Sequence, residues 1–191
     1  MTDSNSDRAR QRGIRERQQE TGESFNGARR RVLAEKGMRE QIAQLTPEEM
    51  TALFNDGARA YTGHRASTHL LTYTPLMGHT YFAPHVKLVP VIDPDEDRPM
   101  TGAFVRDWGA LVEDPKIGRL GGHVIDMVRL AAAFHGVPID LGEHTGNYGH
   151  AHARRAAEAM LIAMGYEEFY HLAEGPGLTR LNELHRSLGI R

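Results

Sequence analysis

The sequence predicts a mainly α-helical fold with a small β or extended element near residues 70–92 and a basic helical arm at the N-terminus. Apolar residues recur at helical spacing along most of the chain, whereas one proline-interrupted stretch is rich in β-branched and aromatic residues. Charge is unevenly distributed, since residues 8–39 carry ten Lys or Arg against four Glu. We therefore expect a disordered tail over 1–7, a basic helical arm over 8–40, and a single compact, mainly helical body over 41–191.

Composition excludes several classes of protein. The 191 residues are 40% hydrophobic and 25% charged, which is ordinary for a globular chain. The absence of cysteine excludes disulfides, thiolate nucleophiles and Cys-ligated zinc. The N-terminus has no apolar segment typical of a signal peptide, and the apolar runs are far shorter than the roughly 20 residues of a membrane span. We expect a cytoplasmic protein with no membrane partner.

The arm is predicted to form two helical segments. Residues 8–20 have almost no apolar stripe, which is typical of a segment that is disordered or awaits a partner. After a break at Thr21 and Gly22, apolar residues recur at helical spacing, with Ser24 as the N-cap and Gly37 as the end of the helix.

The arginines of the arm are candidate phosphate ligands, because cationic side chains that neutralise phosphates dominate nucleic-acid affinity. The predicted nucleic-acid-binding residues are Arg8, Arg10, Arg12, Arg15, Arg17, Arg29, Arg30 and Arg31. Phe25 is the only aromatic residue of the arm, which argues against recognition of single strands by base stacking. The alternatives are a solvated helix pair that docks on the body, and an arm that binds the acidic body of another copy.

The first half of the body contains a helix and then extended segments. Thr46, Pro47 and Glu49 form a capping-box pattern that predicts a helix over 46–61. Short strands or extended segments are expected over 70–76 and 82–92, confined to edges by their prolines. An acidic surface loop follows over 93–99.

The second half of the body is predicted to be helical. Apolar residues at helical spacing predict helices over about 101–113, 116–135 and 150–164, with shorter ones over 166–173 and 178–188. Gly136 and Pro138 end the long second helix of this series.

A Gly- and His-rich loop over 142–152 is the best candidate for chemistry. His144, His150 and His152 are candidate catalytic acids or bases, because imidazole titrates near neutral pH. A divalent transition metal could use His150 and His152 with Glu143, provided that the segment is extended, since helical spacing would separate the two imidazoles. The competing interpretation is a connection whose polar side chains only cap the next helix.

The same loop is a candidate anion site. Asn147 precedes the helix expected from residue 150, and Arg154 and Arg155 follow within about one turn, so a phosphate at the helix N-terminus would be near both charges. The sequence contains no P-loop, no GxSxG and no GxGxxG motif, which argues against the enzymes that these motifs mark.

Three functional hypotheses follow. The first is an accessory or regulatory protein that binds nucleic acid or a partner through the arm. The second is a small His-dependent enzyme, with or without a metal, whose site is the 142–155 segment. His79 and His85 could contribute to the same site. The third is an oligomeric assembly protein whose arm docks on a second copy.

Overall fold

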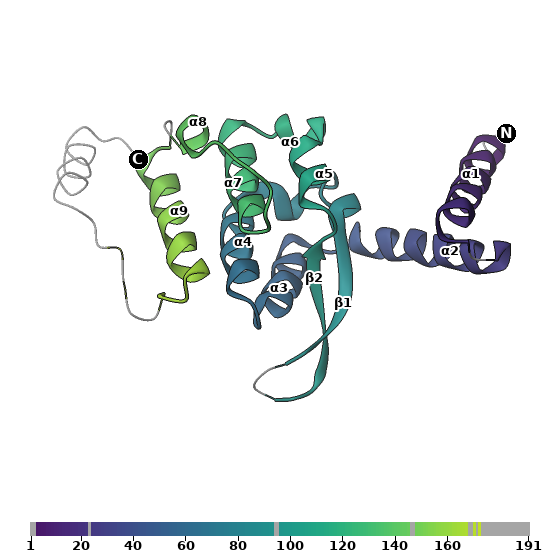
Figure 1. The fold of residues 1–191 in the computed structure, drawn as a ribbon, viewed down its shortest axis with the longest axis horizontal. Helices are drawn as coiled ribbons and strands as arrows, with labels where there is room; N and C mark the ends of the chain where they lie inside the picture. The colour runs from purple at the N-terminus through teal and green to yellow at the C-terminus, as the bar shows by residue number, and fades with distance from the viewer. Residues whose placement is uncertain are drawn as a thin grey trace. The chain divides into compact units, whose positions relative to one another are not determined.

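In the computed structural model, the residues described are 3–22, 24–93, 96–145, 148–167, 170 and 172, without the side chains of 3–10, 25, 26, 31, 144 and 145. These residues form nine α-helices, two short 3-10 helices and one two-stranded antiparallel sheet, which confirms the predicted mainly α fold (Figure 1). The chain divides into two compact units, Met1–Leu45 and Thr46–Arg191.

The first unit is a pair of helices, α1 (Asp3–Thr21) and α2 (Phe25–Ile42). Gly22 connects them with a φ of 67°, a left-handed conformation that favours glycine. Ser24 caps α2 by accepting a hydrogen bond from the backbone N–H of Gly27, as predicted. The buried apolar residues described in this unit are Ile14, Ala28 and Ile42, with 3%, 0% and 1% of their surface exposed.

Two boundaries in the first unit differ from the sequence prediction. The tail expected over 1–7 is helical from Asp3 onward, and α2 continues through Gly37 to Ile42. Glycine in the interior of a helix costs only about 1 kcal/mol relative to alanine, so the flanking helix formers continue the helix past it.

The second unit begins with α3 (Pro47–Ala58), whose N-terminus carries the predicted capping box. The Glu49 backbone N–H donates to Thr46 Oγ1 over 3.2 Å, and the Thr46 backbone N–H donates to Glu49 Oε2 over 2.8 Å. Two of the N–H groups that a helix start leaves unpaired are thereby satisfied.

Thr46→Ala is expected to lower the free energy of unfolding by about 1 kcal/mol, because Glu49 N–H loses its acceptor. Urea denaturation followed by circular dichroism measures the change, with Thr46→Ser as the control that keeps the hydroxyl and the stability. Equal stability of Thr46→Ala and the natural chain would contradict the cap.

Helix α4 (Thr62–Thr72) occupies the centre of the second unit. It packs against α3, against α7 (Gly122–Ala133) and against α9 (His150–Ala163). The largest fully buried side chains are apolar and are contributed by several elements of the chain, among them Leu70, Leu71, Leu76, Phe82, Leu111, Ile117, Val124, Met127 and Leu130.

A β-hairpin packs on α3. Strands β1 (Val86–Ile92) and β2 (Pro99–Val105) pair antiparallel, with Val86 opposite Val105 and Ile92 opposite Pro99. The 3-10 helices η1 (Pro75–Gly78) and η2 (Ala83–His85) precede β1. Strand β2 packs against α3, at a point where Gly57 and Gly102 bring the two backbones together.

The hairpin corrects two sequence predictions. Residues 70–76, expected to be extended, form the end of α4 and the start of η1, and only 86–92 of the predicted β element is a strand. Its partner, β2, includes residues 101–105, which were predicted to be helical. The helix in that region is the shorter α5 (Trp108–Glu113), capped by Asp107.

The remaining helices agree with the prediction in part. The helix expected over 116–135 is divided into α6 (Pro115–Gly118) and α7, because Gly121 adopts a φ of 119° between them. A short helix, α8 (Leu141–Thr145), lies in the predicted loop, and α9 matches the helix expected over 150–164. Of the helix expected over 166–173, the described residues are not helical, and 178–188 lies outside the described residues. No helix in the described part of the chain is long and apolar enough to cross a membrane.

Candidate functional site

The two helices of the first unit are joined by an ion pair. Arg17 Nη1 donates to Glu35 Oε1 over 2.5 Å, which links α1 to α2 on the side where Ile14 and Ala28 are buried. Arg17 therefore has a structural partner within the arm.

Four arginines of the arm are exposed and turned away from this contact. Arg12 and Arg15 are both exposed in α1, and the rotation of a helix puts Arg12 about 160° and Arg15 about 100° from the buried Ile14. Arg29 and Arg30 follow the buried Ala28 in α2.

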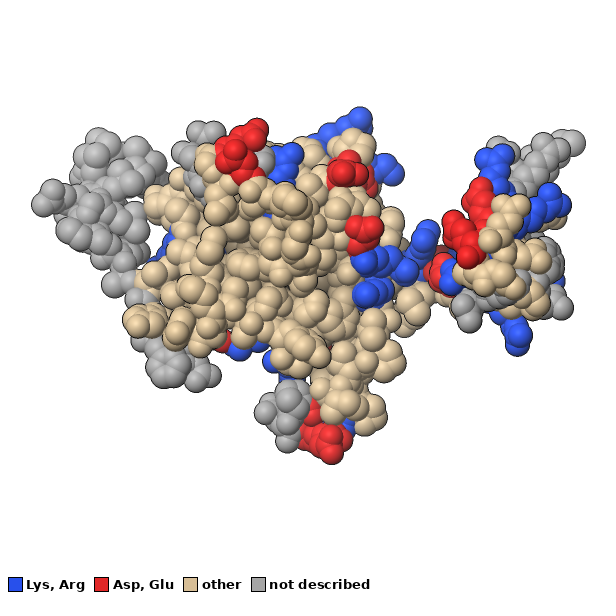
Figure 2. All heavy atoms as spheres, viewed as in Figure 1, with Lys and Arg blue, Asp and Glu red and all other residues tan. Residues whose placement is uncertain are grey.

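None of these four forms an ion pair with a residue that the structure describes. Arg8 and Arg10 belong to α1 and Arg31 to α2, but their side chains lie outside the described part. Figure 2 shows blue Lys and Arg atoms at the surface of the first unit, with red carboxylates among them.

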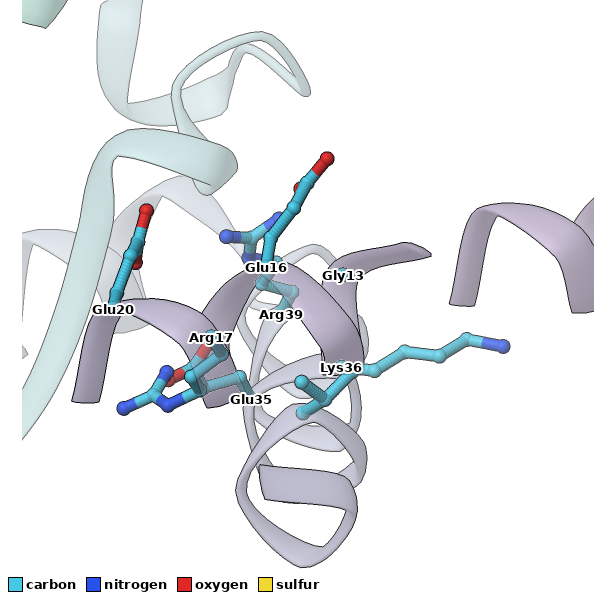
Figure 3. Close-up of a pocket in the computed structure, with 8 residues that line it drawn as sticks. Gly13, Glu16, Arg17, Glu20, Glu35, Lys36 and Arg39 are labelled. Carbon is cyan, nitrogen blue, oxygen red and sulfur yellow. The ribbon is translucent and has the colours of Figure 1, made fainter. Parts of the chain in front are cut away.

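A cavity of about 350 Å³ lies between α1 and α2 (Figure 3). It is lined by Gly13, Glu16, Arg17, Glu20, Val32, Glu35, Lys36 and Arg39. Figure 3 shows Arg17 and Glu35 side by side while the Lys36 side chain extends away. Because three cations face three glutamates, this cavity has no preference for an anion, and the outer face of the helices is the better phosphate surface.

Much of the segment 142–152, which was predicted to be a loop with catalytic or metal-binding residues, is helical. It contains most of α8 and the start of α9. Glu143 lies in α8, and His150 is the exposed first residue of α9. The side chain of His144 and all of Asn147 lie outside the described residues. Because His152 is also in α9, it points about 200° away from His150.

His152 instead meets aromatic neighbours from other elements. Its ring centroid lies 5.2 Å from that of His123 and 5.4 Å from that of Tyr73. Among the described residues, no three His, Asp or Glu side chains are placed to hold a metal ion. The metal hypothesis on Glu143, His150 and His152 therefore gains no support from the described residues.

His79 and His85 have local partners of their own. His85 Nε2 lies 2.9 Å from Asp114 Oδ2, and this hydrogen bond lowers the pKa of the Asp114 carboxyl. The His79 ring stacks on Tyr81 with 5.6 Å between centroids. Neither histidine is in contact with His150 or His152 in the described structure, so the described residues give no shared pocket of histidines.

The sequence did not indicate that two half-buried histidines, His64 and His135, lie together. The rings of His64 and His135 are 4.7 Å apart, and Trp108 stacks on His135 at 4.5 Å with 10° between the planes. Ser67 Oγ lies 2.8 Å from His135 Nε2 and also donates toward the carbonyl oxygens of Gly63 and Ala131.

The surroundings of His135 and Ser67 are those of packed side chains and not those of a catalytic serine with its histidine base. Burial, with the charge of His64 second, lowers the pKa of His135 to about 4. Ser67 is only 2% exposed, and the adjacent cavity holds about 10 Å³, room for a single water. No substrate could reach the Ser67 hydroxyl.

The two arginines predicted to bind an anion face different surroundings. Arg154 is exposed, and its Nε donates to Glu158 Oε1 over 2.9 Å. Arg155 lies against α4, where its Nε donates to the backbone oxygen of His69 over 2.9 Å and its guanidinium lies 5.5 Å from the Tyr73 ring centroid. Burial, opposed in part by the charge of Glu158, lowers the pKa of Arg155.

Comparisons of the chain with models of protein families, with curated proteins and with solved structures find no match.

Proposed function

We propose that the protein binds nucleic acid through its arm, as an accessory or regulatory protein whose body positions or regulates the complex. The observation that carries the proposal is the exposure of Arg12, Arg15, Arg29 and Arg30, which have no acidic partner among the described residues. Unpaired guanidinium groups at a helix surface suit the phosphate backbone, to which arginine donates two hydrogen bonds at once.

The chemistry of this face favours the backbone of double-stranded nucleic acid. Phe25 is the only aromatic residue in the sequence of the arm, which argues against binding by base stacking. Phosphate contacts position a protein without reading the sequence, so we expect affinity that depends on salt and little on base sequence.

The proposal places the protein in the cytoplasm, where nucleic acid is accessible. The enzyme hypothesis has less support, because the described histidines of the predicted loop are in separate environments. The hypothesis of an assembly protein, in which the arm binds the acidic body of a second copy, makes a different prediction for the same variants, and the experiment below distinguishes the two.

The test is a salt titration of binding to a short DNA duplex of random sequence. The slope of log K against log salt should be about −4 or steeper, since each neutralised phosphate contributes about −0.9. The variant Arg12→Gln/Arg15→Gln/Arg29→Gln/Arg30→Gln should bind about 100-fold more weakly at 0.1 M salt and lose most of that slope. Gln is chosen because it keeps the helix propensity of Arg.

Two controls isolate the effect of charge at this face. Replacing the same four residues with Lys should keep most of the affinity, whereas Arg98→Gln/Arg119→Gln on the body, both exposed, should leave it unchanged. Light scattering without DNA reports self-association. Absence of duplex binding at low salt, or equal binding by the Gln variant, would overturn the proposal. A dimer that the Gln substitutions dissociate, without any DNA binding, would favour assembly.

A further inference from the structure

A second cavity lies in the second unit, where α3, α4 and α9 come together. Its volume is about 320 Å³, at the lower end of the roughly 300–1,000 Å³ typical of small-molecule sites. The lining residues are Asn55, Ala58, Arg59, Arg65, Thr68, His69, Thr72, Arg155 and Ile162. The cavity is distinct from the arm, since every lining residue belongs to Thr46–Arg191.

The lining is cationic. Three arginines and a histidine contribute to it, and none of its nine residues is acidic. The carboxylates that pair with these cations approach from outside the lining, with Asp56 and Asp93 on Arg59 and Glu167 on Arg65. Each of these carboxylates orients an arginine, and none of them is among the residues that line the cavity.

Arg155 is the best anchor for an anion. Its Nε donates to the His69 backbone oxygen over 2.9 Å, and its Nη2 donates to Thr72 Oγ1 over 3.4 Å. Its nearest carboxylate, Glu158, is 3.9 Å from Nη1, so no close ion pair neutralises the guanidinium. Glu158 is engaged at shorter range by His69, 3.1 Å away, and by Arg154.

The rest of the lining suits a polar, hydroxylated ligand. Asn55, Thr68 and Thr72 supply an amide and two hydroxyls, and the apolar contribution is limited to Ala58 and Ile162. The lining contains no Phe, Tyr or Trp, which disfavours the stacking that a nucleobase would require.

We propose that this cavity binds the phosphate monoester of a small hydroxylated molecule, with Arg155 and Arg65 on the phosphate and Asn55 and Thr68 on its hydroxyl groups. A dianionic phosphate matches the forked donors of arginine, and no carboxylate is among the residues that line the cavity. His69 adds a further donor beside the phosphate when protonated.

Isothermal titration of the full chain with glycerol 3-phosphate tests the proposal. We expect saturable binding in which inorganic phosphate competes and glycerol alone is silent. Arg155→Gln and Arg65→Gln should each weaken binding tenfold or more, because a charged hydrogen-bond donor is lost. Amide NMR signals of Thr68, His69 and Thr72 should shift on titration.

The adjacent arginine is a matched control. Arg154→Gln removes the same charge one residue away on α9, but Arg154 does not line the cavity, so affinity should change less than threefold. The quadruple Gln variant of the arm should also bind normally, which separates this site from the DNA surface. Since Arg155 also supports the packing of α9 on α4, Arg65, a half-buried residue of α4 that pairs with Glu167, provides an independent variant. No binding at millimolar glycerol 3-phosphate, or equal weakening by Arg154→Gln and Arg155→Gln, would overturn the proposal.

Discussion

Alanine at position 102 is expected to destabilise the second unit by about 3 kcal/mol or more. Gly102 lies in β2 directly against Gly57 of α3, and an added Cβ would be 2.5 Å from Gly57 Cα and 2.8 Å from Gly57 N. Both neighbours are backbone atoms, so no side chain can rotate to make room. The strand would have to move away from α3, which would open the contact that holds the hairpin on the helix.

The same contact predicts the effect of the reciprocal change. A Cβ on Gly57 would lie 2.6 Å from the backbone oxygen of Ala103, so Gly57→Ala should be comparably destabilising. Gly118→Ala is the control in the same unit, because nothing lies within 4 Å of its Cβ position. Thermal and urea unfolding measure the three variants. A Gly102→Ala protein as stable as Gly118→Ala would contradict the close approach of α3 and β2.

This glycine contact also explains why the sequence did not reveal β2. Phe104 and Trp108 are four residues apart, a spacing that favours a helix, and the prediction extended that helix back to residue 101. The strand conformation of 101–105 depends on pairing with β1 and on space beside Gly57, both of which are non-local. By contrast, α3 was predicted closely because Thr46, Pro47 and Glu49 specify its start within four residues.

The candidate sites also differ in whether local sequence or non-local packing determines them. The arginines of the arm follow from a local excess of charge, and Arg155 was named from its place near a helix start. Arg59, Arg65 and His69 were missed, because only the packing of α3, α4 and α9 brings them to one cavity. The residues at 65, 69 and 72 recur at helical spacing on α4, and that polar stripe was the available signal.

Acidification is expected to destabilise the second unit through the half-buried pair of His64 and His135. In the folded chain the pKa of His135 is lowered to about 4 by burial, with the charge of His64 as the second cause. The pKa of His64 is also lowered, by burial and then by Lys87. In the unfolded chain both imidazoles take up a proton near pH 6.5.

Protonation therefore favours the unfolded chain over a defined range of pH. Well above pH 7 neither state binds the proton, so the free energy of unfolding is unaffected by His135. Between about pH 6.5 and pH 4 only the unfolded chain binds it, and stability should fall by about 2 kcal/mol at pH 5 from this group alone. Urea unfolding at pH 7.5, 6 and 5 measures the decrease.

The variant His135→Phe tests whether His135 causes the loss of stability at low pH. His135→Phe keeps a ring against Trp108 and removes the titrating nitrogen, while Ser67 retains its bond to the Gly63 oxygen. Stability at pH 7.5 should change modestly, because a hydrogen bond is lost and apolar surface is gained, and the decrease toward pH 5 should become shallower by about 2 kcal/mol. His150→Gln, at an exposed position of α9, should leave the pH profile of the natural chain unchanged. If His135→Phe loses as much stability at pH 5 as the natural chain does, the acid sensitivity arises elsewhere, and the pair is neutral packing with no energetic link to pH.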